Sequence, residues 1–361
     1  MTLASTHGRA RRRDRRVYLR SHPVLFALLA ATRGRPVRRI GRTLLVHDAD
    51  AYREALTRLP LDRAAAGTTG GAARAALADT AVGGVLFDQE GAAHRAGRRG
   101  LAEDLGAAGV ERLRALWRPV LVRRLAPLAH GGEVELVALA QELAGEVVCA
   151  LLGSGSTADP VTVAEAAARA AAASIRDHLP GPRRKTGDGG ADATARLRQL
   201  LGTTDPLDAM VAVAAVNTTL AALPRAVAWC ADAGLWGEAA DEAQRPALAD
   251  ELLRLTAPSP LLPRVAGADG TVGGCPVRGG DRLLLVARHA VGAHRRSPRP
   301  ELAHLVFGAG PHTCPGARLA RAQVADVLAA LAPHRPVVVR ARVNRRAALP
   351  SWRTLTVRAA S

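Results

Sequence analysis

The residues best suited to chemistry lie in one glycine-rich stretch, HLVFGAGPHTCPGARLARAQ, at positions 304–323. Glycines surround its single cysteine, Cys314, and glycine lets a backbone pass close to a flat or bulky partner. From about Ala317 the apolar spacing predicts a helix, so Cys314 lies just before a helix N-terminus. The positive helix end favours a thiolate, the form of cysteine that binds a metal. The stretch therefore predicts a metal-ligating cysteine, and a buried structural cysteine in a turn is the alternative.

Two pairs of charged residues form further candidates. His94 and Arg98 are four apart, so they share one face of an expected helix. A cationic pair can bind carboxylates, and the arginine fork can do so bidentately, but a solvated basic face is the alternative. Glu251 and Arg254 are three apart and can form an ion pair on another expected helix.

The segment 206–234 is apolar nearly all round and has no glycine before its last position. This pattern predicts a long helix buried at the centre of the protein. Asn217 and Thr218 are polar residues in its middle. A helical threonine can bond the carbonyl four residues back, so a threonine satisfied within its own helix is the alternative to a catalytic role.

The segment FGAGPHTCPGA resembles the heme-binding loop of the cytochrome P450 family, in which a phenylalanine precedes Gly-x-Gly-x-His-x-Cys-x-Gly. Every fixed position is filled, by Phe307, Gly308, Gly310, His312, Cys314 and Gly316. The resemblance implies heme b as cofactor, with Cys314 as the thiolate ligand of its iron. It also implies that Phe307 shields the sulfur and that His312 reaches a heme propionate.

The resemblance extends over about 24–358. It implies that His94 and Arg98 hold heme propionates and that Arg264, shortly after the Glu-x-x-Arg pair, reaches a propionate as well. A surface position for Arg264 is the alternative. Loops at 61–84 and 178–192 are expected near the substrate pocket, the second shorter than its counterpart in the family.

The segment AAVNTT at 214–219 is similar to the family's distal-helix pattern, Ala-Gly/Ala-x-acid-Thr-Thr. The match implies that Ala214 and Ala215 lie over the heme and that Thr218 is the oxygen-activating alcohol. Asn217 stands where the family has an acid. Because an amide cannot carry a proton as a carboxylate does, we expect water to substitute or the chemistry to be less standard.

Composition indicates the fold class. Of 361 residues, 48% are hydrophobic and only 2% aromatic, so Leu, Val and Ala must form the core. Alanine-rich segments favour helix, and we expect a mainly α fold with a smaller β-rich region, the cytochrome P450 fold in a single domain at 22–361. A β-hairpin with its turn around Gly41 is expected at 37–48, short strands at 272–286, and closing strands at 337–343 and 349–358. At 133–137 the sequence allows either a short strand or the start of a helix. Residues 1–21 are expected to form a basic, disordered tail.

The formal charge is +18, carried almost wholly by arginine. The arginines are scattered and lack interleaved aromatics, which disfavours nucleic-acid binding and leaves an acidic protein as partner. Four distant cysteines without a CxxC pair, and no apolar signal segment, indicate a reducing cytoplasm. The apolar segment 22–31 is too short for a membrane span.

The resemblance implies a bacterial heme-thiolate monooxygenase that oxidises a small, largely apolar metabolite, in secondary metabolism. Electrons are expected from NAD(P)H through ferredoxin reductase and a ferredoxin. A basic docking face would comprise Arg95, Arg99, Arg318 and Arg321. Two alternatives stay open: a heme enzyme of atypical chemistry (cyclisation, coupling, nitrogen chemistry or peroxide use), and a catalytically silent heme-binding or partner-recruiting protein.

Overall fold

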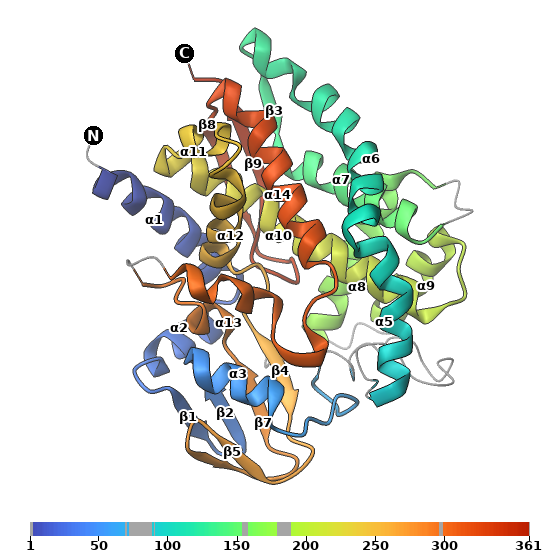
Figure 1. Cartoon of the computed structure of the whole chain (residues 1–361), viewed down its shortest axis with the longest axis vertical. Helices are drawn as coiled ribbons and strands as arrows, with labels where there is room; N and C mark the ends of the chain where they lie inside the picture. Colours follow the sequence, from blue (N-terminus) through green and yellow to red (C-terminus); the bar gives the residue numbers. More distant parts are fainter. Residues whose placement is uncertain are drawn as a thin grey trace.

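The computed structural model describes residues 3–68, 71, 89, 91–153, 158–178, 189–295 and 299–360. In these ranges the chain forms a mainly helical body, with a four-stranded sheet and the two-stranded sheet β5–β6 at the bottom of Figure 1 and a three-stranded sheet at the top. The expected fold class, mainly α with a smaller β-rich region, is confirmed. The helices are α1 (Leu3–Ser21), α2 (Pro23–Thr32), α3 (Ala49–Thr57), α5 (Gly91–Leu105), α6 (Ala107–Leu125), α7 (Leu136–Leu151), α8 (Pro160–His178), α9 (Gly189–Leu201), α10 (Pro206–Ala233), α11 (Trp236–Ala240), α12 (Arg245–Thr256), α13 (Ala287–Ala290) and α14 (Ala317–Leu331). The strands are β1 (Val37–Ile40), β2 (Thr43–Val46), β3 (Glu133–Glu135), β4 (Leu262–Val265), β5 (Gly270–Val272), β6 (Cys275–Val277), β7 (Arg282–Leu285), β8 (Val337–Asn344) and β9 (Ser351–Arg358).

The lower sheet has the strand order β1-β2-β7-β4. The hairpin β1–β2, predicted from the sequence, turns at Gly41, whose φ of +57° suits glycine. Strand β2 runs parallel to β7 with Leu44 opposite Leu283, and β4 pairs antiparallel with β7. Asp48 then begins α3, because its side chain accepts hydrogen bonds from two backbone N–H groups of the first turn. This sheet and α3 form one of the hydrophobic clusters of the protein.

The upper sheet has the order β3-β9-β8 and lies against α7 and α10. At 133–137 the sequence allowed either a short strand or the start of a helix, and the structure contains both. Glu135 ends β3 and caps α7, its carboxylate accepting a hydrogen bond from the backbone N–H of Ala138 at 2.6 Å. The predicted closing strands near the C-terminus are confirmed as β8 and β9.

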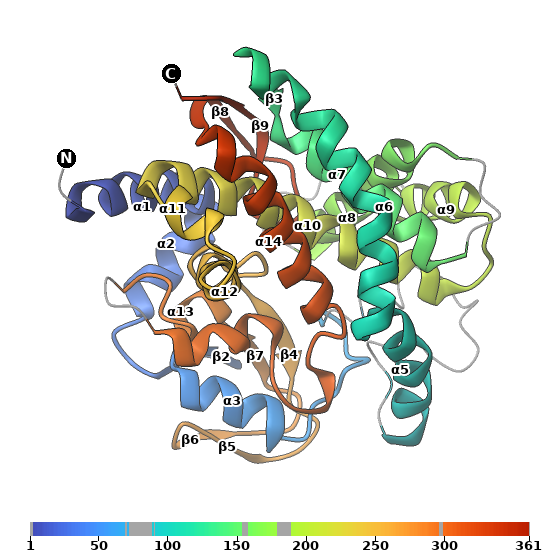
Figure 2. The same cartoon turned by 45° about the horizontal axis from the view of Figure 1, so that its top comes forward.

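The long helix α10 crosses the body behind α12 and α14 (Figure 2). Helices α1, α7, α8, α12 and α14 all pack on it, so the predicted central helix is confirmed. Within the described residues, Leu207–Ala233 is the one segment long and apolar enough to cross a membrane. A core helix of a soluble protein meets the same criterion, and half of the most apolar window is buried inside this protein.

The N-terminal residues were expected to be a disordered tail, and this prediction is wrong. Residues 3–21 form α1, which packs on α10 and buries Val17 and Asp14. The carboxylate of Asp14 accepts hydrogen bonds from the guanidinium groups of Arg225 and Arg288, at 2.6 and 2.7 Å. Two buried cations thus hold the helix in place through one anion, and the segment belongs to the folded body.

Two expected loops lie largely outside the described residues. Of the loop at 61–84, the structure describes 61–68 and residue 71. Of the loop at 178–192, it describes His178 and the residues from Gly189 onward. The last four residues of that expected loop are helical, since α9 begins at Gly189. Helices α8 and α9 are the described elements between α7 and α10.

Candidate functional site

The cysteine loop joins a 3₁₀ helix, Pro300–Phe307, to the long helix α14. Two of its glycines have positive φ, +81° at Gly308 and +72° at Gly310, a backbone conformation that residues with a side chain rarely adopt. A Cβ on Gly310 would lie 3.2 Å from the carbonyl oxygen of Leu56 in α3, so the loop passes close to that helix. The backbone N–H of Cys314 donates to the carbonyl of Phe307 at 2.8 Å. These constraints fix Cys314 immediately before α14, as predicted.

Cys314 has the environment of a cysteine that needs a cationic partner to ionise. The residue is exposed, yet nearby protein atoms desolvate its thiol and raise its pKa. The backbone N–H of Gly316 and the positive charges of Arg98 and Arg321 act in the opposite direction without overcoming desolvation. A bound metal ion would add the positive charge that shifts the ionisation of Cys314 towards the thiolate.

The predicted basic pair of α5 contacts this loop. Arg98 donates to the carbonyl of Thr313 at 2.7 Å. The buried ring of His94 stacks on the ring of His312, with centroids 3.7 Å apart and an interplanar angle of 27°. Residues more than 200 positions apart in the sequence therefore meet at the cysteine loop. The alternative, a solvated basic face, does not describe a pair with these contacts.

Positive charge accumulates around His312. Burial, and then the charge of Arg63, lowers the pKa of His312 to about 3. His94, Arg264 and Arg98 lower this pKa further. The charged groups that lower this pKa are thus arginines and a histidine. Such a cluster favours an anionic ligand with more than one negative group.

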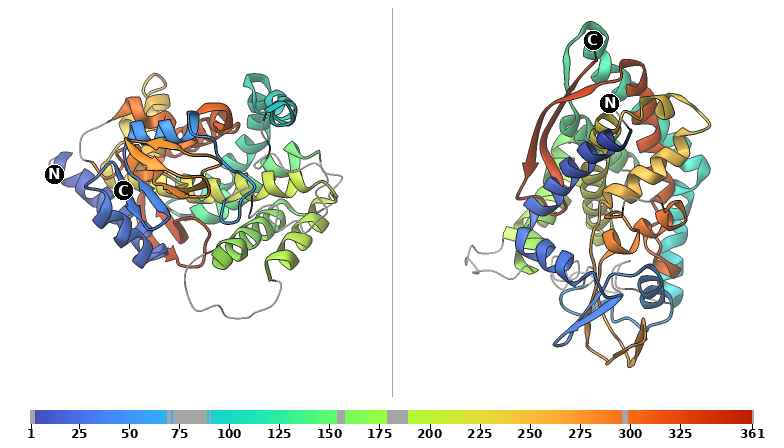
Figure 3. Two further views of the ribbon diagram at one scale, coloured as in Figure 1. Left: turned by 90° about the horizontal axis from the view of Figure 1, so that it is seen from below. Right: turned by 90° about the vertical axis from the view of Figure 1, so that its left-hand side faces the viewer.

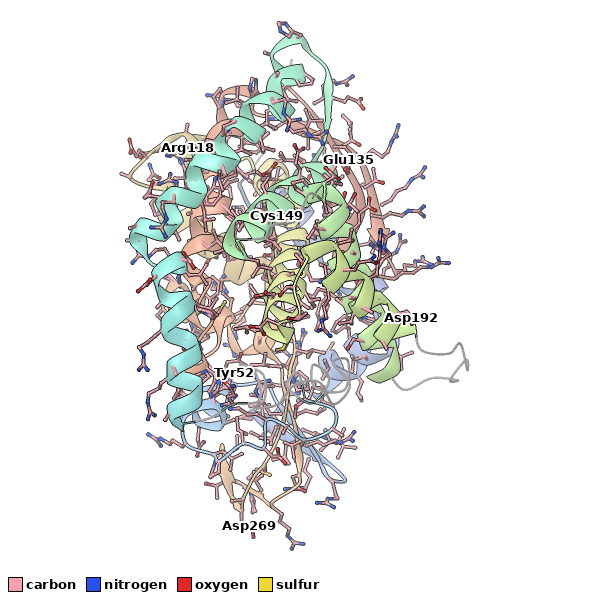
Figure 4. The ribbon with its side chains drawn as sticks, turned by 90° about the vertical axis from the view of Figure 1, so that its right-hand side faces the viewer. Tyr52, Arg118, Glu135, Cys149, Asp192 and Asp269 are labelled. Atoms are coloured by element: carbon pink, nitrogen blue, oxygen red, sulfur yellow. The ribbon has the colours of Figure 1, made fainter. Side chains whose placement is uncertain are left out.

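Arg264 supplies an unsatisfied donor in this cluster. Its Nε is buried without a hydrogen-bond partner, and one terminal nitrogen donates to the carbonyl of Pro263 at 2.8 Å. Burial, and then Arg63, lowers the pKa of Arg264 to about 10. Tyr52 of α3 (labelled in Figure 4) acts on the same group but has its own pKa raised to about 12 by burial, so it stays neutral. The predicted alternative of a surface arginine does not describe this side chain.

The cluster fits the carboxylates of a heme. In the described ranges neither Arg98 nor Arg264 forms an ion pair with a carboxylate. A buried donor without a partner costs about 1–3 kcal/mol, and a buried cation without a counter-ion costs more. Two propionates beside Cys314 would remove both costs. The residues present therefore fit the cofactor that the sequence motif implies.

The distal-helix residues point in two directions. Thr218 donates its hydroxyl to the carbonyl of Ala214 at 2.8 Å, with a longer contact of 3.3 Å to that of Ala215. Asn217 instead donates its amide to the carbonyl of Val213 at 2.7 Å and to that of Ala167 in α8 at 3.4 Å. Ala214 and Thr218 share a face of α10, whereas Asn217 ties α10 to α8. No hydrogen bond among the described residues joins either polar side chain to the cysteine loop.

The Glu-x-x-Arg pair is a structural element beside the site. Both oxygens of the Glu251 carboxylate accept from Arg254, each at 2.6 Å. Arg254 is fully buried, and its remaining nitrogen donates to the carbonyl of Val291 at 2.7 Å. The observed third partner is a backbone carbonyl, which joins α12 to the segment after α13.

Two residues near the site were misjudged or missed. Arg321 was expected in a docking face, but its guanidinium pairs with Asp250 at 2.6 Å and lies 4.6 Å from the centroid of the Phe307 ring. It therefore holds the loop phenylalanine against α14. Arg63 was not singled out, because a lone arginine in an alanine-rich segment has no motif; only its place in the fold brings its charge to His312.

Comparison with known proteins gives a short sequence match and extensive structural ones. No family model matches the chain. A curated relative from Bacillus subtilis (strain 168), YjiB, named as a cytochrome P450, is 34% identical over 94 residues. The match spans only 24% of this chain and 24% of that relative.

Solved structures match nearly the whole chain. P450BioI, in complex with an acyl carrier protein carrying hexadec-9Z-enoic acid, has a TM-score of 0.73 at 17% identity, covering 95% of this chain and 100% of that one. The open form of cytochrome P450 EryK from S. erythraea has a TM-score of 0.70 at 20% identity, covering 94% and 96%. P450 OxyD, involved in the biosynthesis of vancomycin-type antibiotics, has a TM-score of 0.69 at 19% identity, covering 95% and 97%. The resemblance seen in the sequence is thereby confirmed at the level of the fold.

Proposed function

Since this chain belongs to the cytochrome P450 family by its fold, we propose that it is a heme-thiolate monooxygenase that oxidises a small, largely apolar metabolite of secondary metabolism. One observation carries the proposal: a cysteine fixed before α14 shares its surroundings with a cluster of cations that includes an unsatisfied buried guanidinium. A structural cysteine in a turn would need no such cluster.

Each residue of the site has a role in this proposal. Cys314 binds the heme iron as a thiolate, and Arg98, Arg264, His94 and His312 hold the propionates. Charge-assisted hydrogen bonds of this kind are roughly twice as strong as neutral ones, so the arginines contribute most of the anchoring. When bound, the heme supplies the capacity to activate dioxygen with electrons delivered from outside.

The glycines and aromatic residue of the loop serve the cofactor indirectly. Gly308 and Gly316 leave the backbone beside the cysteine free of side chains, so a flat macrocycle can approach. The guanidinium of Arg321 lies over the ring of Phe307, which we propose covers the sulfur in the heme-loaded protein. Ala214 and Ala215 have small side chains, so the surface of α10 that would face the heme leaves room for a small gas molecule.

Thr218 is the proposed alcohol for proton delivery. Its hydroxyl donates to the Ala214 carbonyl and keeps its oxygen lone pairs available to accept from a water. To pass a proton onward the hydroxyl must rotate out of this bond, which costs about 0.5–1.5 kcal/mol. Asn217 cannot supply that proton, since a side-chain amide does not ionise as a carboxylic acid does. Its amide donates instead to two backbone carbonyls.

The contacts of Asn217 also favour a second candidate. An enzyme that uses peroxide, or that couples or cyclises its substrate, needs less proton delivery from a carboxylate at this position. We regard this as the alternative function, and a heme-binding protein without turnover as the third. Of the three, the monooxygenase is preferred because Thr218 is retained.

Electrons are proposed to come from NAD(P)H through ferredoxin reductase and a ferredoxin. Arg95, Arg99 and Arg318 are exposed at the end of the protein where α5 meets the cysteine loop, and they would attract an acidic partner. One structural neighbour is an intact type IV self-sufficient cytochrome P450 monooxygenase, of which this chain covers 51%. For this chain we propose instead that the electron donor is a separate protein and that both act in the cytoplasm.

The test is a product analysis with a panel of apolar metabolites, run with NADPH plus a ferredoxin system and, separately, with hydrogen peroxide. The monooxygenase proposal predicts turnover with the electron donors, reduced at least tenfold by Thr218→Val. Turnover with peroxide alone would establish the alternative function. No turnover with either, in a protein that holds heme, would establish the silent binding protein.

A further inference from the structure

The outward face of α1 carries a stripe of arginines. Four of them, spaced three, four and four residues apart along one side of the helix, are exposed: Arg9, Arg12, Arg16 and Arg20. None of the four forms an ion pair with a residue in the described ranges. The opposite side of α1, with Ala10, Asp14 and Val17, is buried against the body. The stripe therefore presents unpaired positive charge to the surroundings of the protein.

Helix α2 follows directly and exposes an apolar face. Its exposed positions hold no polar side chain: Pro23, Val24, Ala27, Leu28 and Ala31. Val24 is 84% exposed and Leu28 is 46% exposed. A single exposed aliphatic residue is ordinary on a soluble protein, but a whole helix face without a polar group indicates a surface that binds something.

The two faces lie on the same side of the protein. Tyr18 near the end of α1 stacks on Phe26 of α2, with ring centroids 3.7 Å apart. Both rings belong to a buried cluster that includes Leu45 of β2 and Val286. Both helices lie at the left edge of Figure 1, and both are in front when that side is turned to the viewer (Figure 3, right). Their outer faces thus form one surface, the α1–α2 face, in which the arginine stripe adjoins aliphatic side chains.

Charge and apolar surface together indicate the chemistry of the partner. Guanidinium groups are attracted to anionic headgroups, and aliphatic side chains beside them can enter the boundary between headgroups and acyl chains. A nucleic acid would offer phosphates to the stripe but no apolar layer to Val24 and Leu28. We therefore infer that the α1–α2 face binds the surface of an anionic phospholipid membrane, with α1 on the headgroups and α2 at their inner boundary.

Binding through this face would leave the side used for electron transfer free. Helix α5, which carries Arg95 and Arg99, lies at the right of Figure 1, away from α1 and α2, and the view from below agrees (Figure 3, left). A ferredoxin could therefore reach the protein while the protein is bound to a membrane. The inference goes beyond the proposed oxidation and does not depend on it, because none of its residues belongs to the cysteine loop or to α10.

The experiment is co-sedimentation of the purified, heme-loaded full chain with lipid vesicles of two compositions. One is pure phosphatidylcholine, and the other is an equal mixture of phosphatidylcholine and phosphatidylglycerol. We expect at least about tenfold tighter binding to the anionic vesicles. This binding should weaken as the salt concentration rises, because salt screens the attraction between arginines and headgroups.

Two double variants test the charge. Arg12→Glu with Arg16→Glu reverses the middle of the stripe and should weaken binding to the anionic vesicles at least about tenfold. The matched control, Arg118→Glu with Arg196→Glu, makes the same change in net charge on exposed positions of α6 and α9, at the right of Figure 1. It should stay within about twofold, because salt screens charges far from the bound surface.

Two further double variants test the apolar side chains. Val24→Ser with Leu28→Ser keeps every charge and should weaken binding about tenfold, because it removes the aliphatic groups that leave water. Leu116→Ser with Val122→Ser changes two aliphatic side chains of α6 that are 43% and 75% exposed, and should leave binding unchanged. Circular dichroism checks that each variant is folded.

Three results would overturn the inference. The first is equal binding to vesicles of pure phosphatidylcholine, and the second is an equal loss of binding in the stripe variant and its matched control. The third is unchanged binding in the variant of Val24 and Leu28, which would assign the stripe to a soluble polyanion such as an acidic protein. Turnover is not measured in this experiment, so a failure of the proposed oxidation would leave its outcome intact.

Discussion

Two groups of arginines with little or partial exposure differ in whether the protein supplies them with a carboxylate. Arg225 and Arg288 share the carboxylate of Asp14 and also donate to backbone carbonyls, so every charged group there has a partner. Arg98 and Arg264 lie beside the cysteine loop without a carboxylate among the described residues, and one of their nitrogens has no partner at all.

The difference separates structural from functional charge. Burying a cation is costly, and a protein meets that cost with its own anion where the cation serves the fold. Where the protein supplies no anion, a ligand is the natural counter-ion. Asp14 thus marks the first group as an anchor for α1, while we propose that the second group binds the carboxylates of a cofactor.

The largest expected effect comes from removing the anion of the paired group. Asp14→Asn keeps the shape of the side chain but leaves two buried guanidinium groups without a counter-ion. We expect the free energy of unfolding to fall by about 3–5 kcal/mol, measured by urea denaturation. Asp50→Asn, which breaks an exposed ion pair with Arg53, should change it by less than about 0.5 kcal/mol. A loss below 1 kcal/mol for Asp14→Asn would remove the distinction between the two groups.

The unpaired group should respond in the opposite way. Arg264→Leu removes a desolvated cation, so the heme-free protein should be no less stable than the parent. Heme retention should instead fall about 10–100-fold, since a hydrogen bond to a charged group contributes about 1.5–3 kcal/mol. The measurement is the rate of heme transfer to excess apomyoglobin, with Arg38→Leu on exposed β1 as control. Unchanged transfer in Arg264→Leu would argue that this arginine serves the fold.

A pair of histidines away from the site gives a prediction for pH. His47 bonds Thr32 at 3.1 Å and His289 at 2.8 Å, and burial lowers the pKa of His47 to about 4. Because an unfolded histidine titrates near 6.5, the unfolded chain binds the proton first. Stability is therefore complete above about pH 6.5 and falls as the pH drops towards 4.

The expected slope is up to about 1.4 kcal/mol per pH unit for each such histidine. Urea midpoints at pH 7 and pH 5 measure it, and His47→Gln should reduce the difference between them. This variant should leave heme transfer unchanged, because His47 lies in the neighbourhood of α13 and not at the cysteine loop. An unaltered pH dependence in the variant would show that His47 is not held neutral by its burial.

The smallest effect is expected at the surface. Arg99→Glu with Arg318→Glu should slow reduction by a ferredoxin several-fold at low salt and weaken the salt dependence of the rate. Arg340→Glu with Arg342→Glu, on the distant strand β8, is the control. If both double variants behave alike, the docking face lies elsewhere.

The sequence was sufficient for much of the fold. The hairpin at Gly41, the buried helix α10 and the helix after Cys314 all follow from local patterns of turns and apolar residues, and all are confirmed. Helix α1 was missed because its arginine run resembles a solvated tail. Its burial depends on Arg225 and Arg288, more than 200 positions away, and no local pattern reports such a pairing.

In the candidate site too, residues in a local sequence pattern could be predicted and residues brought together only by the fold could not. Spacing alone singled out Cys314, and His94 and Arg98 could be added because the motif gave them a partner. Arg63 could not be found, since its only signal is proximity to His312 in the folded chain. The sequence shows that Arg321 is charged, but it does not show the ion pair with Asp250. That ion pair decides whether the charge of Arg321 is available to a docking partner.

The most direct test is an absorption spectrum of the purified protein, reduced and exposed to carbon monoxide, beside a Cys314→Ser control. Ligation by the thiolate predicts the red-shifted Soret band typical of heme-thiolate proteins, lost in the control. An unshifted band would mean that heme binds without the thiolate. A protein that takes up no heme would contradict the central claim, and the cations around Cys314 would then need another anion.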